Sequence, residues 1–157
     1  MRFAPLAFAL LCARPIGAQQ IANASVPAAV RQGLMSKYPG IEKAAWTLAG
    51  ADYVGVFRTS GAEVSAAFSP AGQWIESATQ VGAITLPDTV KKLIIRAYKG
   101  YQFTDVRRLD RATKPAILFE VHLDKPGEAV TVVFEPNGSI FTGGTHATSA
   151  GGRGTGH

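Results

Sequence analysis

Cysteine is nearly absent from this sequence, and the only one among the 157 residues is Cys12. It lies in a short apolar stretch that follows Arg2 and ends near a small-residue cleavage site, which is the pattern of a secretory signal peptide over residues 1–18. We therefore expect a mature chain without cysteine. That excludes disulfides, thiolate metal sites and a cysteine nucleophile, so hydrophobic packing alone must supply the core.

Catalytic motifs and long hydrophobic runs are also missing. The sequence contains no H-E-x-x-H, G-x-S-x-G, P-loop or EF-hand pattern. After residue 18 no apolar run approaches the length of a membrane-spanning helix. These absences predict a protein that is not an enzyme, binds no cofactor or metal, and has no membrane span after signal cleavage. The signal-peptide pattern predicts that the chain is periplasmic or secreted.

Charge is sparse and uneven. The formal net charge is +5, and the basic residues concentrate between positions 91 and 114. This basic stripe could attract an acidic partner, although the solvated face of a helix with a charged loop is the interpretation we favour. Few aromatic residues are interleaved with it, so we expect no nucleic-acid binding. Its members are Lys91, Lys92, Arg96, Lys99, Arg107, Arg108, Arg111 and Lys114.

One stretch of the sequence occurs twice. Residues 26–40 (VPAAVRQGLMSKYPG) correspond to residues 86–100 (LPDTVKKLIIRAYKG), an offset of 86 minus 26, or 60. Each copy has a helical apolar pattern with a proline in its first turn and a Tyr-x-Gly sequence at its end. Ser25 is the expected cap of the first helix, and residues 85–88 resemble a capping box for the second. Internal repetition predicts two copies of one structural unit.

The pattern after each helix changes to short alternating segments separated by glycine-containing turns, which indicates antiparallel hairpins. We predict strands at 45–48, 52–58, 62–69 and 73–79, and again at 103–109, 116–123, 129–135 and 139–142. The offset rises to 66 at Phe134, which matches Phe68, so about six residues are inserted around 108–115 of the second copy.

The predicted fold class is therefore α+β, with two tandem α-β4 repeats that together form a curved sheet. The expected segments are a signal peptide at 1–18, a linker at 19–24, repeats at 25–80 and 84–142, and a disordered Gly/Thr/His tail at 143–157.

The alternation assigns each strand residue to one of two faces. One phase is strongly apolar and should pack against the helices; it includes Phe57, Phe68, Phe119 and Phe134. The other phase is mixed, and could be an ordinary sheet surface or a surface open to a protein partner. The candidate partner-binding residues are Val54, Val56, Trp74, Leu118, Glu120, His122 and Val133, although Trp46 and Trp74 are also typical core residues.

His122 and Glu120 are two residues apart on one predicted strand, so their side chains share a face. They could form a base with its orienting carboxylate, or half of a metal site. A pair of this kind on a sheet surface is more often structural, and a zinc site needs further ligands. His146 and His157 lie in the tail.

The repeated Val/Leu-Pro helix with its Tyr stop, and the F-x-P-x-G turn of residues 68–72 and 134–138, resemble the PepSY-like and β-lactamase-inhibitor-like (BLIP-like) small exported bacterial proteins. The resemblance covers residues 26–141. It implies two α-β4 units whose concave sheet face could bind a protein. Lys99, where proline is expected, and the insertion near Arg111 depart from the pattern.

The function expected from the sequence is a non-enzymatic exported binding protein that docks a partner in the cell envelope, with peptidase or hydrolase inhibition as the more specific version. The alternative is a periplasmic module that senses a small ligand or metal through His122 and Glu120.

Overall fold

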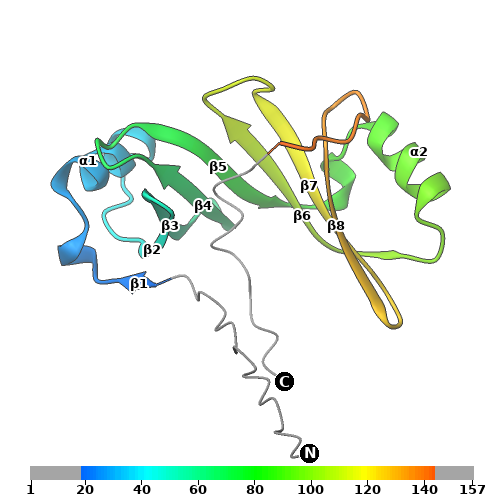
Figure 1. Ribbon diagram of the computed structural model, residues 1–157, viewed down its shortest axis with the longest axis horizontal. Helices are drawn as coiled ribbons and strands as arrows, with labels where there is room; N and C mark the ends of the chain where they lie inside the picture. The colour runs from blue at the N-terminus through cyan, green and yellow to red at the C-terminus, as the bar shows by residue number, and fades with distance from the viewer. Residues whose placement is uncertain (1–18, 144–157) are drawn as a thin grey trace, which may run out of the picture.

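The computed structural model describes residues 19–143, which form one eight-stranded antiparallel sheet with two α-helices (Figure 1). The strands follow chain order from β1 to β8. They are β1 (Gln20–Ile21), β2 (Ala45–Ala49), β3 (Asp52–Thr59), β4 (Ala62–Phe68), β5 (Trp74–Val81), β6 (Gln102–Arg111), β7 (Ile117–Lys125) and β8 (Glu128–Phe134). The helices are α1 (Ala28–Lys37) and α2 (Asp88–Ala97), and each follows a short 3-10 helix, η1 (Asn23–Ser25) or η2 (Ala83–Thr85).

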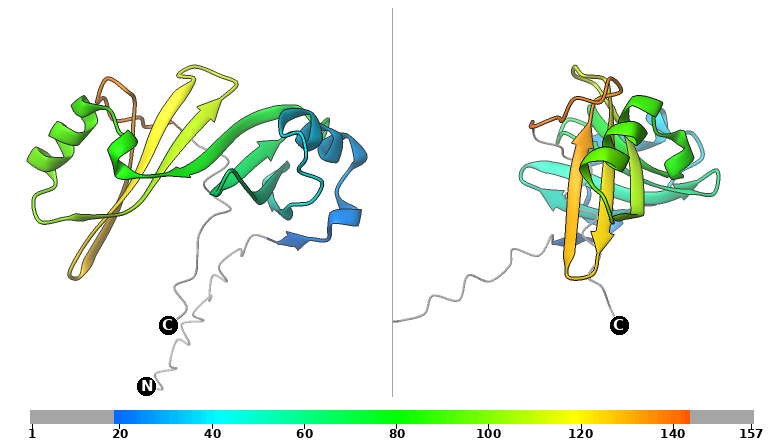
Figure 2. Two further views of the ribbon diagram at one scale, coloured as in Figure 1. Left: turned by 180° about the vertical axis from the view of Figure 1, so that it is seen from behind. Right: turned by 90° about the vertical axis from the view of Figure 1, so that its right-hand side faces the viewer.

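The predicted fold class of two tandem α-β4 repeats is wrong. Strands β5 and β6 pair in continuous register from Glu76–Arg111 to Val81–Val106, so a single sheet runs through both halves of the chain. The molecule is mostly sheet, with a helix at each end (Figures 1 and 2). Periodicity in a sequence shows which residues are strands, but it does not show which strands pair, and here the pairing joins the two halves.

The number of strands in each half also differs from the prediction. Gln20 and Ile21 fall in the predicted linker, yet they pair with β2 as strand β1. Residues 139–142 form no strand and contribute only an isolated bridge between Phe134 and Ile140. The second half therefore has three strands of its own, β6 to β8.

Both predicted helices form, but they begin at Ala28 and Asp88, just after the prolines, and no side chain caps either start. The surroundings of the two helices match residue by residue. Pro27 and Pro87 immediately precede α1 and α2, where the missing N–H of proline breaks no helical hydrogen bond. The N–H groups of Tyr38 and Tyr98 close the last turns on Leu34 and Ile94. The chain then turns at Gly40, whose φ of 88° favours glycine.

Both helices cover the same face of the sheet, which we call the helix face. Residues that pair directly on neighbouring strands point to the same side of the sheet. Phe57 under α1 is connected in this way to Phe119 under α2, by successive pairs through Val64, Thr79 and Arg108. Under α1 lies a core of Val26, Val30, Leu34, Trp46, Phe57, Val64, Ala66 and Phe68. Under α2 lies a core of Leu86, Val90, Ile94, Val106, Phe119, Val121, Leu123, Val132 and Phe134. The predicted helix-facing phase is confirmed in both halves.

The opposite side, here called the helix-free face, has a buried cluster of its own. Val54, Ala67, Ala78, Leu109 and Leu118 come from five successive strands and are all 2% exposed or less. Ala49, Ile75, Val133 and Phe141 pack around them. Phe141 is held there by its backbone N–H, which donates to the carbonyl of Val133. The centre of this face is therefore a third small core rather than open sheet.

None of the helices within residues 19–143 is long and apolar enough to cross a membrane. The predicted signal peptide at 1–18 and all but the first residue of the predicted tail at 143–157 lie outside the described residues. The predicted segments 25–80 and 84–142 adjoin at the end of β5.

Candidate functional site

The candidate residues chosen from the sequence lie in three different environments. Val54 and Leu118 are fully buried in the cluster of the helix-free face, where no partner can contact their side chains. Trp74 lies on the helix face, packed against the core under α1. Val56, Glu120, His122 and Val133 share the helix-free face, and only Val56, His122 and Val133 remain partly exposed.

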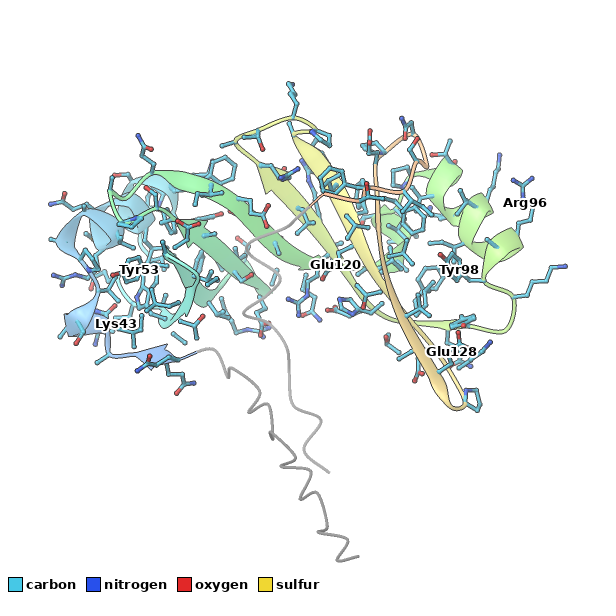
Figure 3. The ribbon with its side chains drawn as sticks, in the orientation of Figure 1. Lys43, Tyr53, Arg96, Tyr98, Glu120 and Glu128 are labelled. Carbon is cyan, nitrogen blue, oxygen red and sulfur yellow. The ribbon has the colours of Figure 1, made fainter. Side chains whose placement is uncertain are left out.

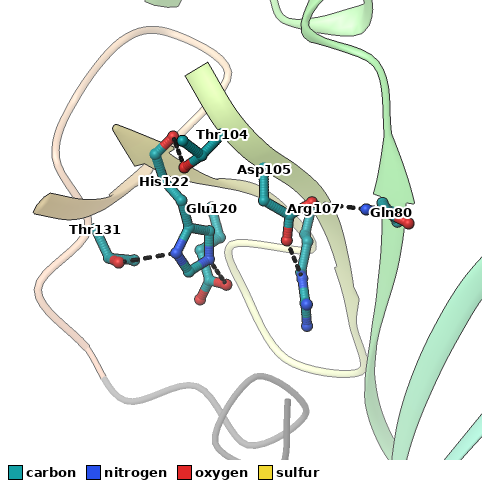
Figure 4. Close-up of polar contacts among 7 residues, drawn as sticks. All are labelled: Gln80, Thr104, Asp105, Arg107, Glu120, His122 and Thr131. Atoms are coloured by element: carbon teal, nitrogen blue, oxygen red, sulfur yellow. Dashed lines mark hydrogen bonds and ion pairs between the residues drawn. The ribbon is translucent and has the colours of Figure 1, made fainter. Parts of the chain in front are cut away.

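Glu120 and His122 belong to a polar patch that flanks the buried cluster on strands β5 to β8 (Figure 4). Direct cross-strand pairing places His122 beside Asp105 and Thr131, and places Arg107 beside Glu120 and Gln80. Figure 3 shows Glu120 near the middle of the molecule, between its two ends. The polar patch is defined here as Gln80, Asp105, Arg107, Glu120, His122 and Thr131.

One half of the polar patch is built around the carboxylate of Asp105. Arg107 donates from Nε to Oδ2 over 2.8 Å, and Gln80 donates from Nε2 to Oδ1 over 3.0 Å. Burial would raise the pKa of Asp105, but hydrogen bonds from Arg107 and Gln80, together with the charges of Arg107 and His122, lower that pKa below its ordinary value. Asp105 is therefore held as an anion with both oxygens in use.

The other half is built around the imidazole of His122. Its Nε2 lies 2.8 Å from Oε1 of Glu120, and its Nδ1 lies 3.0 Å from the hydroxyl of Thr131 (Figure 4). The Glu120 side chain is 7% exposed and the His122 side chain 35% exposed. Both ring nitrogens have partners, so the ring is fixed in orientation and presents its edge at the surface.

The hydrogen bonds at both ring nitrogens of His122 limit what this side chain can do in metal binding or catalysis. A metal-ligating histidine uses one ring nitrogen for the metal and the other for an outer partner, whereas both nitrogens of His122 bind protein groups. Within residues 19–143 no group of three or more His, Cys, Asp or Glu side chains is arranged to hold a metal. A general base likewise needs a nitrogen that can reach a substrate. In this arrangement both ring nitrogens of His122 are already engaged by protein groups.

The basic stripe is divided by the fold. Lys92, Arg96 and Lys99 are exposed on or just after α2, which agrees with a solvated helix face. Arg107 pairs with Asp105 in the polar patch, and Arg111 pairs with Glu76 at 3.2 Å. Arg108 pairs with Asp110 on the helix face.

Sequence reasoning chose only Glu120 and His122 among the six residues of the polar patch. Asp105 and Arg107 are two residues apart on one strand, as are Glu120 and His122, and this alternation was a usable signal. Arg107 was counted only as part of the basic stripe. Gln80 and Thr131 carry no pattern of their own, because their place depends on the pairing of β5 with β6 and of β7 with β8.

Comparison with known proteins finds no matching protein family and no match among curated proteins. Solved structures do match. A DUF2874 family protein from Bacteroides uniformis has a TM-score of 0.66 at 23% identity, over 73% of this chain and 85% of that chain. A BLIP-like protein from Bacteroides fragilis has a TM-score of 0.62 at 24% identity, over 73% and 83%. A protein from Bacteroides eggerthii that is proposed to be periplasmic has a TM-score of 0.68 at 20% identity, over 73% and 85%.

These likenesses show the fold and nothing further, because all three identities are below 25%. The BLIP-like resemblance expected from the sequence is confirmed at that level. The PepSY part of the resemblance finds no support among these structures and stays a prediction.

Proposed function

We propose that this chain is a non-enzymatic exported binding protein that docks a protein partner on its helix-free face, over the polar patch. The observation that carries the proposal is the polar patch itself. It lies beside a buried apolar cluster on a side of the sheet that neither helix covers.

The energetic argument starts from burial. The side chains of Arg107 and Glu120 are 11% and 7% exposed, and burying charged groups in a sheet costs several kcal/mol per ion unless they are paired. Apolar residues would stabilise the same positions at lower cost. A patch that keeps charges there, each fixed by hydrogen bonds, offers preorganised charges and dipoles to a partner.

The partly exposed apolar residues Val56 and Val133 extend this surface beyond the charged groups. Polar groups fix the orientation of a partner, and apolar contact next to them supplies affinity. Export is supported by the signal-like sequence at 1–18 and by the likeness to a proposed periplasmic protein. The BLIP-like neighbour makes inhibition of a hydrolase the more specific version of the proposal.

The test is capture of envelope proteins by the immobilised chain, with each captured protein identified and its binding remeasured with purified material. Thr131→Lys and Val56→Lys place a charge on the docking surface at accessible positions and should weaken binding of that protein at least about tenfold, or 1.4 kcal/mol. Val54 and Leu118 are unsuitable, because charge there would disrupt a buried cluster.

Lys92→Glu is the matched control, since Lys92 is exposed on α2 on the other side of the sheet. It should leave binding unchanged, and thermal unfolding should show that all variants fold. Unchanged affinity in both docking-surface variants, Thr131→Lys and Val56→Lys, would overturn the proposal. Inhibition of the captured protein, if it is a hydrolase, tests the specific version separately.

A further inference from the structure

A pocket of about 510 Å³ lies on the helix face, between the core under α1 and the core under α2. The helices lie at opposite ends of the sheet (Figure 2), and the pocket forms over strands β5, β6 and β7 between them. Its volume falls in the range of small-molecule sites. It is lined by Lys37, Tyr38, Trp74, Ser77, Thr79, Asp110, Arg111, Ala116 and Ile117.

Two aromatic rings of the pocket are fixed by one buried hydroxyl. Ser77, 2% exposed, accepts a hydrogen bond from Nε1 of Trp74 over 2.7 Å and is also hydrogen-bonded to the hydroxyl of Tyr38. Tyr38 packs edge-on against Phe57 of the core. The rings therefore keep their positions without a ligand, which lowers the entropic cost of binding one.

The charge of the pocket is unbalanced toward positive. Asp110 is paired with Arg108 at 2.9 Å, and Arg111 is paired with Glu76. Lys37 forms no ion pair with any residue that the structure describes; its ammonium lies 3.7 Å from the centre of the Trp74 ring. An ammonium over an indole retains its attraction for an anion, because the ring carries no net charge.

The opposite wall is apolar and comes from the longer β6–β7 hairpin. Ala116 and Ile117 lie where the second half has about six more residues than the first. Thr79 adds a hydroxyl to the lining. One cation without an ion-pair partner among the described residues, hydroxyl groups and apolar walls define the chemistry that fits.

We propose that this pocket binds a small organic anion, a carboxylate attached to a flat aromatic ring. Lys37 holds the carboxylate, and Trp74, Tyr38 and Ile117 enclose the ring. The site is separate from the proposed protein-docking surface, which lies on the other face of the sheet. Either proposal can fail while the other stands.

The test is a titration of the full ¹⁵N-labelled chain with indole-3-acetate, phenylacetate and 1-naphthoate, followed by amide chemical shifts. At least one probe should give saturable shifts centred on Ser77, Thr79 and Ile117. Lys37→Gln should weaken that probe about tenfold, as expected for loss of an ion pair of about 1.4 kcal/mol. The neutral analogue indole-3-acetamide should bind the unaltered chain more weakly and be insensitive to Lys37→Gln.

Lys43→Gln is the matched control, because Lys43 is an exposed lysine of the same half and does not line the pocket. Ala116→Trp should fill the pocket and abolish binding while the chain still folds. The proposal is overturned by any of three results: no saturable shifts with the three probes, shifts centred elsewhere, or equal effects of the two lysine variants.

Discussion

The indole of Trp46 lies over the backbone of Gly55, its direct partner on the neighbouring strand. A Cβ at Gly55 would lie 3.0 Å from Cζ3 of that ring. The corresponding pair in the second half is Val106 and Val121. In the first half the Trp46 ring fills the space above Gly55, whereas in the second half two valines share the equivalent space. The two halves thus fill similar cores with different residues.

This complementarity predicts that Gly55→Val destabilises the fold by about 1–3 kcal/mol, because the new side chain has no space beneath Trp46. Trp46→Val in the same chain should recover part of that loss, since it recreates the Val–Val pair of the second half. Chemical denaturation of both variants measures the difference. Equal stability of the single and double variants would contradict the packing argument.

A second close contact joins α1 to the turn after β4. A Cβ at Gly33 would lie 2.2 Å from the carbonyl oxygen of Gly72. Replacing glycine by alanine normally stabilises a helix by about 1 kcal/mol. Whether Gly33→Ala raises or lowers the free energy of unfolding therefore shows if the close contact matters. Gly33→Ala should instead destabilise by about 1–3 kcal/mol, because the turn must move away from the helix.

The control for this contact is Gln32→Ala, an exposed position on the same helix, where the change should stay within about 0.5 kcal/mol. The second half lacks this close contact. Leu93 is at the position equivalent to Gly33, and a Cβ at Gly138, the counterpart of Gly72, would lie 3.7 Å from its nearest atom, in Thr89. A stabilising Gly33→Ala would show that α1 does not need this close approach.

The cluster on the helix-free face should contribute measurably to stability. Leu118→Ala removes a fully buried side chain and should cost about 2–5 kcal/mol of unfolding free energy. Ile84→Ala is the control, because Ile84 is 85% exposed and should change stability by less than about 0.5 kcal/mol. Similar effects at the two positions would mean that this face is open, as the sequence first indicated.

The stability of the polar patch should depend on pH through Asp105. The pKa of Asp105 is lower in the folded chain than its ordinary value of 3.8. Its contribution is therefore present above pH 3.8 and is lost as the pH falls through the folded value. Asp105→Asn should lower stability at pH 7, and its difference from the unaltered chain should shrink below pH 3.8.

Denaturation at a series of pH values measures this difference. Asp124→Asn, at an exposed position on β7, should leave the stability at pH 7 within about 0.5 kcal/mol of the unaltered chain. A difference between Asp105→Asn and the unaltered chain that stays constant from pH 7 to pH 3 would show that the ionised carboxylate is not what stabilises the patch.

The sequence by itself determined the elements and the helix-facing side of the sheet. Both helices, seven of the strands and the two cores beneath the helices follow from apolar spacing, because a helix and a strand bury side chains with different local periods. It also placed Glu120 and His122 on one face, since residues two apart on a strand point the same way. The exported, non-enzymatic character stays a prediction.

Only the tertiary structure decided how the elements combine. Pairing of β5 with β6 produced one sheet instead of two repeats, and it brought Gln80 to Arg107 and Asp105. A register shift between Ala67 and Phe68 placed Trp74 on the helix face and Ile75 on the other. Alternation separates two faces but does not show what covers each one, because burial depends on contacts between residues far apart in the chain.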